Sequence, residues 1–111
     1  MGAYDTAVAK GATPVAALDF TASTDSVGQI TCSADTTTSV QGPNIPLLNG
    51  VYVKAMGANT GYIYVAFNAG NVQTVGYELK AGDVLILQIT NLNLCYFTAS
   101  VGGEKVCWMK A

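Results

Sequence analysis

The stretch YELKAGDVLILQITNLNLCYFTASVGGEKVCWM, residues 77–109, decides the fold of this 111-residue chain. It holds three runs rich in β-branched, aromatic and long apolar residues, at 84–90, 94–100 and 105–109. Each run is bounded by Gly, Asn or Asp, which tolerate a positive φ or hydrogen-bond their own backbone in turns. The runs recur about every ten residues, a spacing typical of a small sandwich or barrel rather than of βαβ units.

The same alternation of short runs and turns continues upstream. Val51 and Val53 alternate with Tyr52 and Lys54, the pattern of a strand that buries one face. Gly42 and Pro43 end an edge strand, because proline cannot donate to a sheet ladder. The strands predicted upstream of residue 77 lie at 15–21, 27–33, 36–41, 51–56, 62–67 and 72–75.

No segment shows a convincing helix pattern, so the chain is predicted to be all-β with about eight to ten short strands. The expected architecture is an antiparallel β-sandwich of jelly-roll type, and a small Greek-key barrel is the alternative. Residues 1–14 are small, polar and rich in Gly and Ala, and they are interpreted as an extended N-terminal arm. Residues 15–111 then form a single β-sandwich domain.

The composition favours association. Hydrophobic residues make up 50% of the chain and charged residues 11%, whereas about 25% are charged in typical soluble domains. A surface so poor in charge has little electrostatic protection against self-association or partner binding. One interpretation is a compact neutral domain; the one we favour is a subunit that hides much of its surface against partners.

The charge inventory excludes several functions. The chain has five lysines, scattered along the sequence, and no arginine or histidine. Nucleic-acid binding is therefore not expected, because phosphate recognition favours arginine forks and lysine clusters. Without histidine there is no imidazole base and no histidine metal ligand. No apolar run reaches 18 residues and residues 1–20 do not resemble a secretory signal, so no membrane association is expected.

The carboxylates do not suggest an active site. Asp83 and Glu104 are the best pair for glycoside hydrolysis, but neither has the apolar surroundings that would raise a carboxyl pKa. Asp25 and Asp35 lie beside Ser or Thr without calcium-loop spacing, so turn chemistry explains them. No catalytic residue, cofactor or metal site is predicted.

Three cysteines stand in strand-like runs, at Cys32, Cys95 and Cys107. An odd number without C-x-x-C spacing favours small buried hydrophobic side chains over a disulfide framework or a zinc site. A Cys95–Cys107 bridge is the one pairing considered. Trp108 is expected in the core or at an interface.

The turns and strands from residue 49 onward resemble a family pattern. The segments that carry it are NTGYIYV at 59–65, GYELKAGD at 76–83, NLNLCY at 91–96 and GEKVCW at 103–108. Together with the size of the chain, they resemble the capsid decoration, or staple, proteins of epsilon-fifteen-like short-tailed phages. The likeness covers about half of the chain and does not extend to its N-terminal half.

This resemblance implies a jelly-roll virion protein on the outer surface of the phage head. Such a protein is a homo-oligomer, dimer or trimer, at capsid symmetry positions, and it bridges major capsid protein subunits without catalysis. The alternative function is a carbohydrate-binding module or head-fibre domain that attaches the virion to cell-surface glycans.

The capsid contacts are predicted in the two segments least able to form a core of their own, the arm and a proline-containing loop. A second set consists of two tyrosines at period two on one strand, which suits either an aromatic interface or a sugar platform. The predicted contacts are Ala3, Tyr4, Asp5, Val8, Lys10, Pro14, Gln41, Pro43, Asn44, Ile45, Pro46 and Leu48, and the two tyrosines are Tyr62 and Tyr64.

Overall fold

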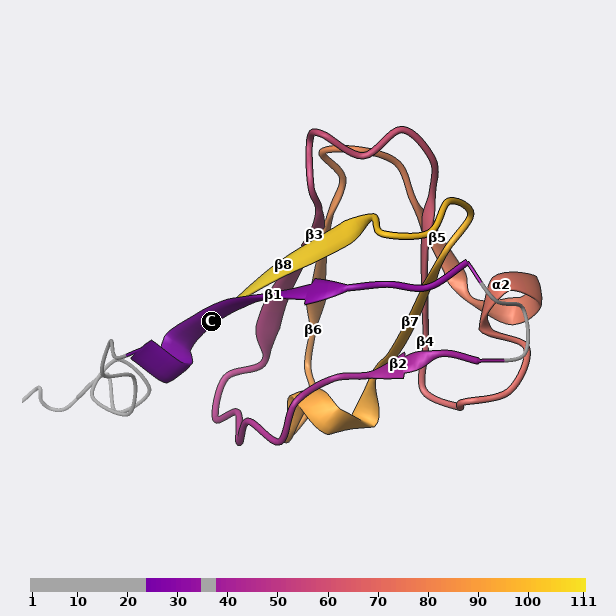
Figure 1. Ribbon diagram of the computed structural model, residues 1–111. Helices are drawn as coiled ribbons and strands as arrows, with labels where there is room; N and C mark the ends of the chain where they lie inside the picture. The colour runs from indigo at the N-terminus through magenta and orange to yellow at the C-terminus, as the bar shows by residue number, and fades with distance from the viewer. Residues whose placement is uncertain (1–23, 35–37) are drawn as a thin grey trace, which may run out of the picture.

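The computed structural model describes residues 24–34 and 38–111, which form two four-stranded antiparallel sheets (Figure 1). The first sheet has the order β1-β8-β3-β6 and the second the order β2-β7-β4-β5. The first sheet consists of β1 (Val27–Thr31), β8 (Lys105–Lys110), β3 (Val51–Ala55) and β6 (Val84–Leu87). The second consists of β2 (Val40–Gln41), β7 (Tyr96–Ala99), β4 (Ile63–Ala66) and β5 (Tyr77–Leu79). The all-β, two-sheet prediction is therefore confirmed, whereas the arm and the predicted strand at 15–21 lie outside the described residues.

The core lies between the two sheets. Along β3 the residues alternate between buried and exposed, so that Val51, Val53 and Ala55 face inward as predicted. Phe97 and Ile63 meet them from the second sheet, each fully buried. Trp108 belongs to this core as well, and its ring lies against Gly28, where an added Cβ would stand 2.8 Å from the ring.

The prediction of a strand at residues 72–75 is wrong. These residues form a single helical turn, α2 (Val72–Val75), which lies against β4 and β7 on the outer side of the second sheet (Figure 1). Asn71, the residue before this turn, has a φ of 58°, which is a left-handed conformation that asparagine tolerates. Val72 is only 1% exposed, so burial against the sheet overrides the β propensity of the sequence VQTV.

Several predicted strands are shorter than expected because turn chemistry ends them. A 3-10 helix, η2 (Leu92–Leu94), precedes β7, and the side chain of Asn91 caps it by accepting from the backbone N–H of Asn93 at 2.9 Å. A second 3-10 helix, η1 (Thr24–Ser26), leads into β1. Among the described helices, none is long and apolar enough to span a membrane.

All three cysteines are free thiols. Cys32 and Cys95 are buried as expected, and Cys107 is partly exposed. The Cys95–Cys107 bridge is not formed, because Cys107 belongs to the first sheet and Cys95 directly precedes β7 of the second.

Candidate docking face

An apolar row crosses all four strands on the outer side of the first sheet. The register places Val27 beside Met109, Met109 beside Tyr52, and Tyr52 beside Ile86. These side chains are 57%, 50%, 39% and 57% exposed, respectively. Because alternate residues of a strand point to opposite faces, the whole row points away from the core. We call these four residues the apolar row.

A hollow of about 370 Å³ lies beside the row. It extends toward Val84, which is 56% exposed, and toward the partly exposed thiol of Cys107. The apolar row, Val84 and Cys107 together are called the apolar face. The residues that line the hollow are Val27, Tyr52, Lys54, Val84, Cys107, Trp108 and Met109.

The charges on this side of the sheet are positive. Lys54 lines the hollow, and Lys105 lies on β8 two residues before Cys107, on the same side of the strand. None of the outward residues on β1, β8, β3 and β6 carries a carboxylate. The face therefore suits an occupant that brings apolar side chains and a negative charge.

Such a face differs from the outer surface of an ordinary antiparallel sandwich. One side of an antiparallel sheet normally packs on the core and the other carries polar residues toward water. Single exposed apolar side chains need no explanation, whereas a contiguous row of them is a candidate interaction surface. The apolar face is therefore a candidate site for docking another protein segment.

The outer side of the second sheet is different. Its register places Thr98 beside Tyr64 and Tyr64 beside Glu78, and we call these three residues the polar row. The turn at α2 comes close to this row, since a Cβ added at Gly76 would stand 3.2 Å from the Cβ of Tyr64. Thr98 is only 1% exposed. The chain itself thus covers Thr98 and part of Tyr64, whereas Glu78 is exposed.

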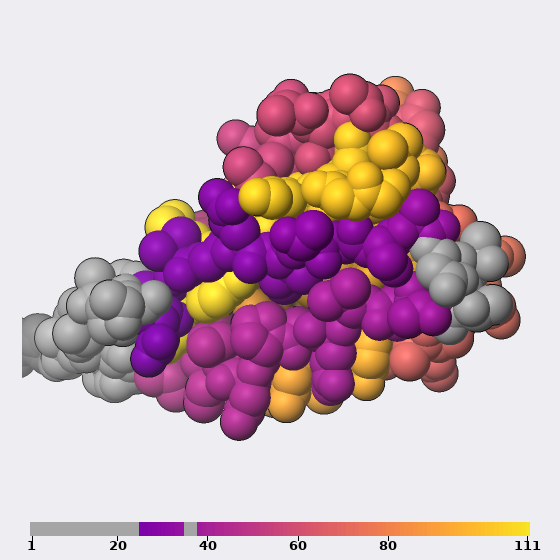
Figure 2. All heavy atoms as spheres, viewed as in Figure 1, coloured from indigo at the N-terminus to yellow at the C-terminus, as the bar shows by residue number. Residues whose placement is uncertain are grey.

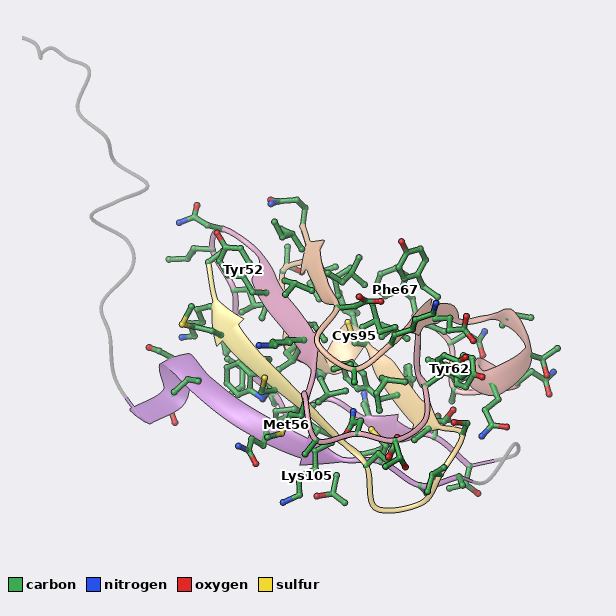
Figure 3. All side chains as sticks on the ribbon, turned by 90° about the horizontal axis from the view of Figure 1, so that it is seen from above. Tyr52, Met56, Tyr62, Phe67, Cys95 and Lys105 are labelled. Atoms are coloured by element: carbon green, nitrogen blue, oxygen red, sulfur yellow. The ribbon has the colours of Figure 1, made fainter. Side chains whose placement is uncertain are left out.

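The two predicted platform tyrosines lie on this second side. Tyr62 is 40% exposed, and its backbone N–H donates to Ser100 Oγ at 2.8 Å. Tyr64 is half-buried; burial raises the pKa of its hydroxyl, and the carboxylate of Glu78 raises this pKa further. Figure 3 shows Tyr62 on the side of α2, away from Tyr52.

The loop at residues 41–48 is held by its own chain. Gln41 Nε2 donates to the carbonyl of Asn93 at 2.8 Å, and Asn91 Oδ1 accepts from the backbone N–H of Ile45 at 3.2 Å. The backbone N–H of Leu47 donates to the carbonyl of Thr90 at 2.9 Å. No partner is needed to order it. The other predicted contacts of the loop, Pro43, Asn44, Pro46 and Leu48, are exposed.

The predicted contacts of the arm, Ala3, Tyr4, Asp5, Val8, Lys10 and Pro14, lie outside the described residues. Sequence reasoning also missed the apolar face itself. Its only signal was the outward position of apolar residues on separate strands, whose neighbours in the sheet were unknown.

Glu104, one of the two carboxylates considered for hydrolysis, is buried. It is 8% exposed and accepts hydrogen bonds from the backbone N–H and the Oγ1 of Thr60, the latter at 2.9 Å, and from the N–H of Gly61 at 2.8 Å. The bond from the Thr60 N–H is the main reason why the pKa of this carboxyl lies below its usual value. Glu104 thereby fastens the turn at 57–61 to the start of β8. Its role is structural.

Asp83, the other candidate carboxylate, accepts from the backbone N–H of Lys80 at 2.9 Å and closes a tight turn before β6. Each of the two carboxylates thus accepts hydrogen bonds within its own turn, and the two turns are separate. Among the residues that the structure describes, no group of three or more His, Cys, Asp and Glu side chains is placed to hold a metal ion.

Comparison with known proteins identifies no relative. No family model matches the chain, and neither a curated protein nor a solved structure matches it. The apolar face, the strand order and the sequence motifs are therefore the features from which a function is inferred.

Proposed function

We propose that this protein is a structural component of a tailed-phage head that decorates the outer capsid surface and bridges major capsid protein subunits. The apolar face is the observation that carries the proposal, because such a surface is stable when another protein buries it. The motifs that resemble decoration proteins supply the class of partner. A protein of this kind acts by shape and burial, so it needs no reactive group.

We also infer that the sandwich is a jelly roll. Its strands pair as β1 with β8, β2 with β7, β3 with β6 and β4 with β5. This nested order is that of a long antiparallel ribbon wound into two sheets, which is how a jelly roll is built. Viral capsid proteins and lectins use this fold, so it agrees with the proposal at the level of fold analogy. An experimental structure with a different strand pairing would remove this support.

Bridging several subunits reduces the demand on each contact. When one contact of a bridging protein opens, the others keep it at a high effective concentration, so the whole attachment exceeds its parts. A decoration protein therefore opposes the outward pressure of packaged DNA even if each contact is modest. The arm at 3–14 and the exposed part of the loop at 41–48 remain the predicted capsid contacts.

The test uses heads that lack this protein. The purified chain is expected to bind them stoichiometrically and to restore the retention of DNA on heating or on addition of a chelator. Particle-associated protein is measured by sedimentation, and released DNA by nuclease sensitivity. If depleted heads resist heat as well as complete ones, the stabilising function is wrong.

The glycan-binding alternative has one observation in its favour. The exposed ring of Tyr62 lies on the same side as Tyr64, whose register partner is the carboxylate of Glu78. An aromatic face beside a hydrogen-bond acceptor is suited to a sugar. A glycan array probed with the natural chain and with Tyr62→Ala and Tyr64→Ala variants tests it. Unchanged binding by both variants, or no binding by the natural chain, would remove this alternative.

A further inference from the structure

We propose that β6 pairs with β6 of a second copy of this chain, antiparallel and about a twofold axis. The first sheets of the two molecules then form one continuous sheet. This inference concerns the edge of the first sheet and does not require the capsid function. It follows from the outer side of β6, from the exposure of its inward side chains, and from the order of its residues.

β6 is the last strand of the first sheet, and no described strand lies on its outer side. Figure 3 shows it beyond β3, on the side away from β8. The backbone N–H of Ala55 donates to the carbonyl of Asp83 at 3.0 Å. Because hydrogen-bonded pairs alternate along an antiparallel ladder, Val84 and Ile86 direct their backbone N–H and C=O groups away from β3. We call this outer side of β6 the open edge.

The other three sheet edges are protected. β2 has two residues and is soon followed by Pro43, and β5 has three residues and contains Glu78. Short strands, prolines and charges are the means by which sheets avoid pairing with other chains. Figure 2 shows the atoms of β1 between those of β8 and those of the segment with β2, and the inward Ile30 is 7% exposed. β6 has the sequence VLIL, without a charge or a proline.

The inward side chains of β6 are incompletely covered. Leu85 and Leu87 pack against the core, yet both are partly exposed. Their partners on β3, Val53 and Val51, are 0% exposed. A strand on the open edge would complete the cover of the two leucines, and the burial of apolar side chains is favourable.

A second copy of β6 fits the open edge because the strand is complementary to itself. With Ile86 opposite Ile86 of the second copy, Leu85 lies opposite Leu87 of that copy. Residues opposite each other in an antiparallel pair share one face, so the leucines meet on the inner side. On the outer side, the apolar row continues into the apolar row of the second copy. Such a contact is the same patch on both molecules, as a twofold dimer requires.

Charge does not oppose this pairing. On β3 and β6 the one charged side chain is that of Lys54. Three strand spacings and four residue steps separate the two Lys54 side chains of the dimer, about 20 Å, whereas salt screens charges beyond about 8 Å. A contact one strand long buries less than the roughly 800 Å² per partner of a standard interface. The dimer should therefore be reversible in solution and favoured where an assembly holds copies together.

Two variants of the full chain, both with Cys107→Ser, test the register. Ile86→Cys and Val84→Cys introduce thiols at positions that are 57% and 56% exposed, and Cys32 and Cys95 are buried. In the dimer, position 86 faces itself with Cα atoms about 5.5 Å apart, within the limit of about 7 Å for a disulfide. The two positions 84 are about 14 Å apart. Mild oxidation should link Ile86→Cys at least tenfold faster, measured on non-reducing gels. Equal rates overturn the inference.

A pair of charge variants tests whether position 86 meets its own copy. Ile86→Lys or Ile86→Glu alone places like charges directly opposite each other, which is destabilising, so each should dimerise at least tenfold more weakly than the natural chain. A mixture of the two places opposite charges there and should restore a heterodimer. Native mass spectrometry measures the dimers, and melting curves check that both variants fold. A mixture that dimerises no better than either variant alone overturns the inference.

Other occupants of the open edge give different results. If Ile86→Cys is linked no faster than Val84→Cys in the free protein but is protected from a maleimide on heads, a capsid segment lies there and the inference is wrong. Protection already present in the free monomer would mean that the chain covers its own edge, which also overturns it. If the dimer forms and does not bind heads, the capsid function is wrong and the pairing of β6 stands.

Discussion

The two outer sides of the sandwich differ in how far their side chains are exposed to solvent. On the second sheet, α2 lies over the polar row, and Val72 and Thr98 are each 1% exposed. On the first sheet, the apolar row is 39% to 57% exposed. Within residues 24–34 and 38–111, the turn at α2 therefore lies over part of the more polar outer side, and no described element lies over the apolar row.

This arrangement is the reverse of what a self-sufficient monomer would favour. Burial of apolar surface is the main driving force of folding and association, so a monomer gains most by covering Met109 and Ile86. The covering turn lies instead over Thr98, whose Oγ1 has no hydrogen-bond partner among the described residues. This difference is the observation that supports the proposal of a partner on the apolar face.

The largest contrast is expected from one substitution made on each side. Val72→Ala removes two methyl groups from the fully buried contact of α2, and should lower the free energy of unfolding by about 2 kcal/mol. Val84→Ala makes the same chemical change on the apolar face, where Val84 is 56% exposed. That variant should stay within about 0.5 kcal/mol of the natural chain. Urea denaturation followed by fluorescence measures both.

Equal losses in the two variants would contradict the comparison. A loss of about 2 kcal/mol for Val84→Ala would mean that the apolar face is already buried in the free protein, either by the same chain or by a second copy. Since residues 1–23 lie outside the described part of the chain, this measurement also reports whether the chain's own N-terminal segment covers the face.

The second prediction concerns binding rather than folding. Ile86→Lys places a charge in the apolar row and should weaken attachment to heads at least tenfold, about 1.4 kcal/mol, because burying an unpaired charge is costly. The melting temperature should not change. Thr31→Lys is the control, since Thr31 is also exposed and outward on β1 but lies outside the apolar row. Sedimentation of heads with each variant measures attachment; equal attachment would show that the apolar row is not the contact.

Much of the fold was predictable because its cause is local. The alternation of apolar and polar residues along 51–55 predicted which side chains are buried. The turns that contain Gly and Asn predicted where most strands begin and end. The helical turn at 72–75 was not predictable, because VQTV favours a strand and only its burial against the second sheet makes it helical. The strand β5 (Tyr77–Leu79) was also missed, because it has only three residues and follows that helical turn directly.

The candidate site was not predictable, because its parts are far apart in the sequence. The apolar row joins residues 27, 52, 86 and 109, which meet only through the strand order and the register. Glu104 similarly serves a turn 43 residues away. Each local pattern shows that a residue points outward, but a single sequence does not show which outward residues are neighbours.

The third prediction tests the covered side. Thr98→Val keeps the shape of the side chain and removes the buried hydroxyl without a partner, so the free energy of unfolding should rise by about 1 kcal/mol. Thr31→Val on the open side should change it by less than about 0.5 kcal/mol. Thermal unfolding followed by circular dichroism measures both variants. A loss of stability for Thr98→Val would show that the hydroxyl is hydrogen-bonded in solution.

The smallest expected effect is a change in thiol reactivity, and it reports directly on whether the apolar face is occupied. Burial raises the pKa of Cys32 to about 12, with a further increase from Glu104, and burial raises that of Cys95 to about 11. At pH 8 the reactive thiolate is therefore about 0.01% of Cys32 and about 0.1% of Cys95. Only Cys107, which is partly exposed, should react quickly with a maleimide in the folded chain.

Occupation of the hollow should then slow the labelling of Cys107 several-fold. The rate is measured by mass spectrometry for the free protein and for the protein bound to heads. The reference thiol is Val101→Cys in a Cys107→Ser background, since Val101 is 46% exposed and lies outside both the apolar face and the predicted contact loop. Protection of Cys107 without protection of the reference thiol would show that the partner lies on the apolar face. Protection of the reference thiol alone would show that the contact lies away from the apolar face. The ratio of the Cys107 rates in the free and head-bound protein therefore measures how far attachment covers the apolar face.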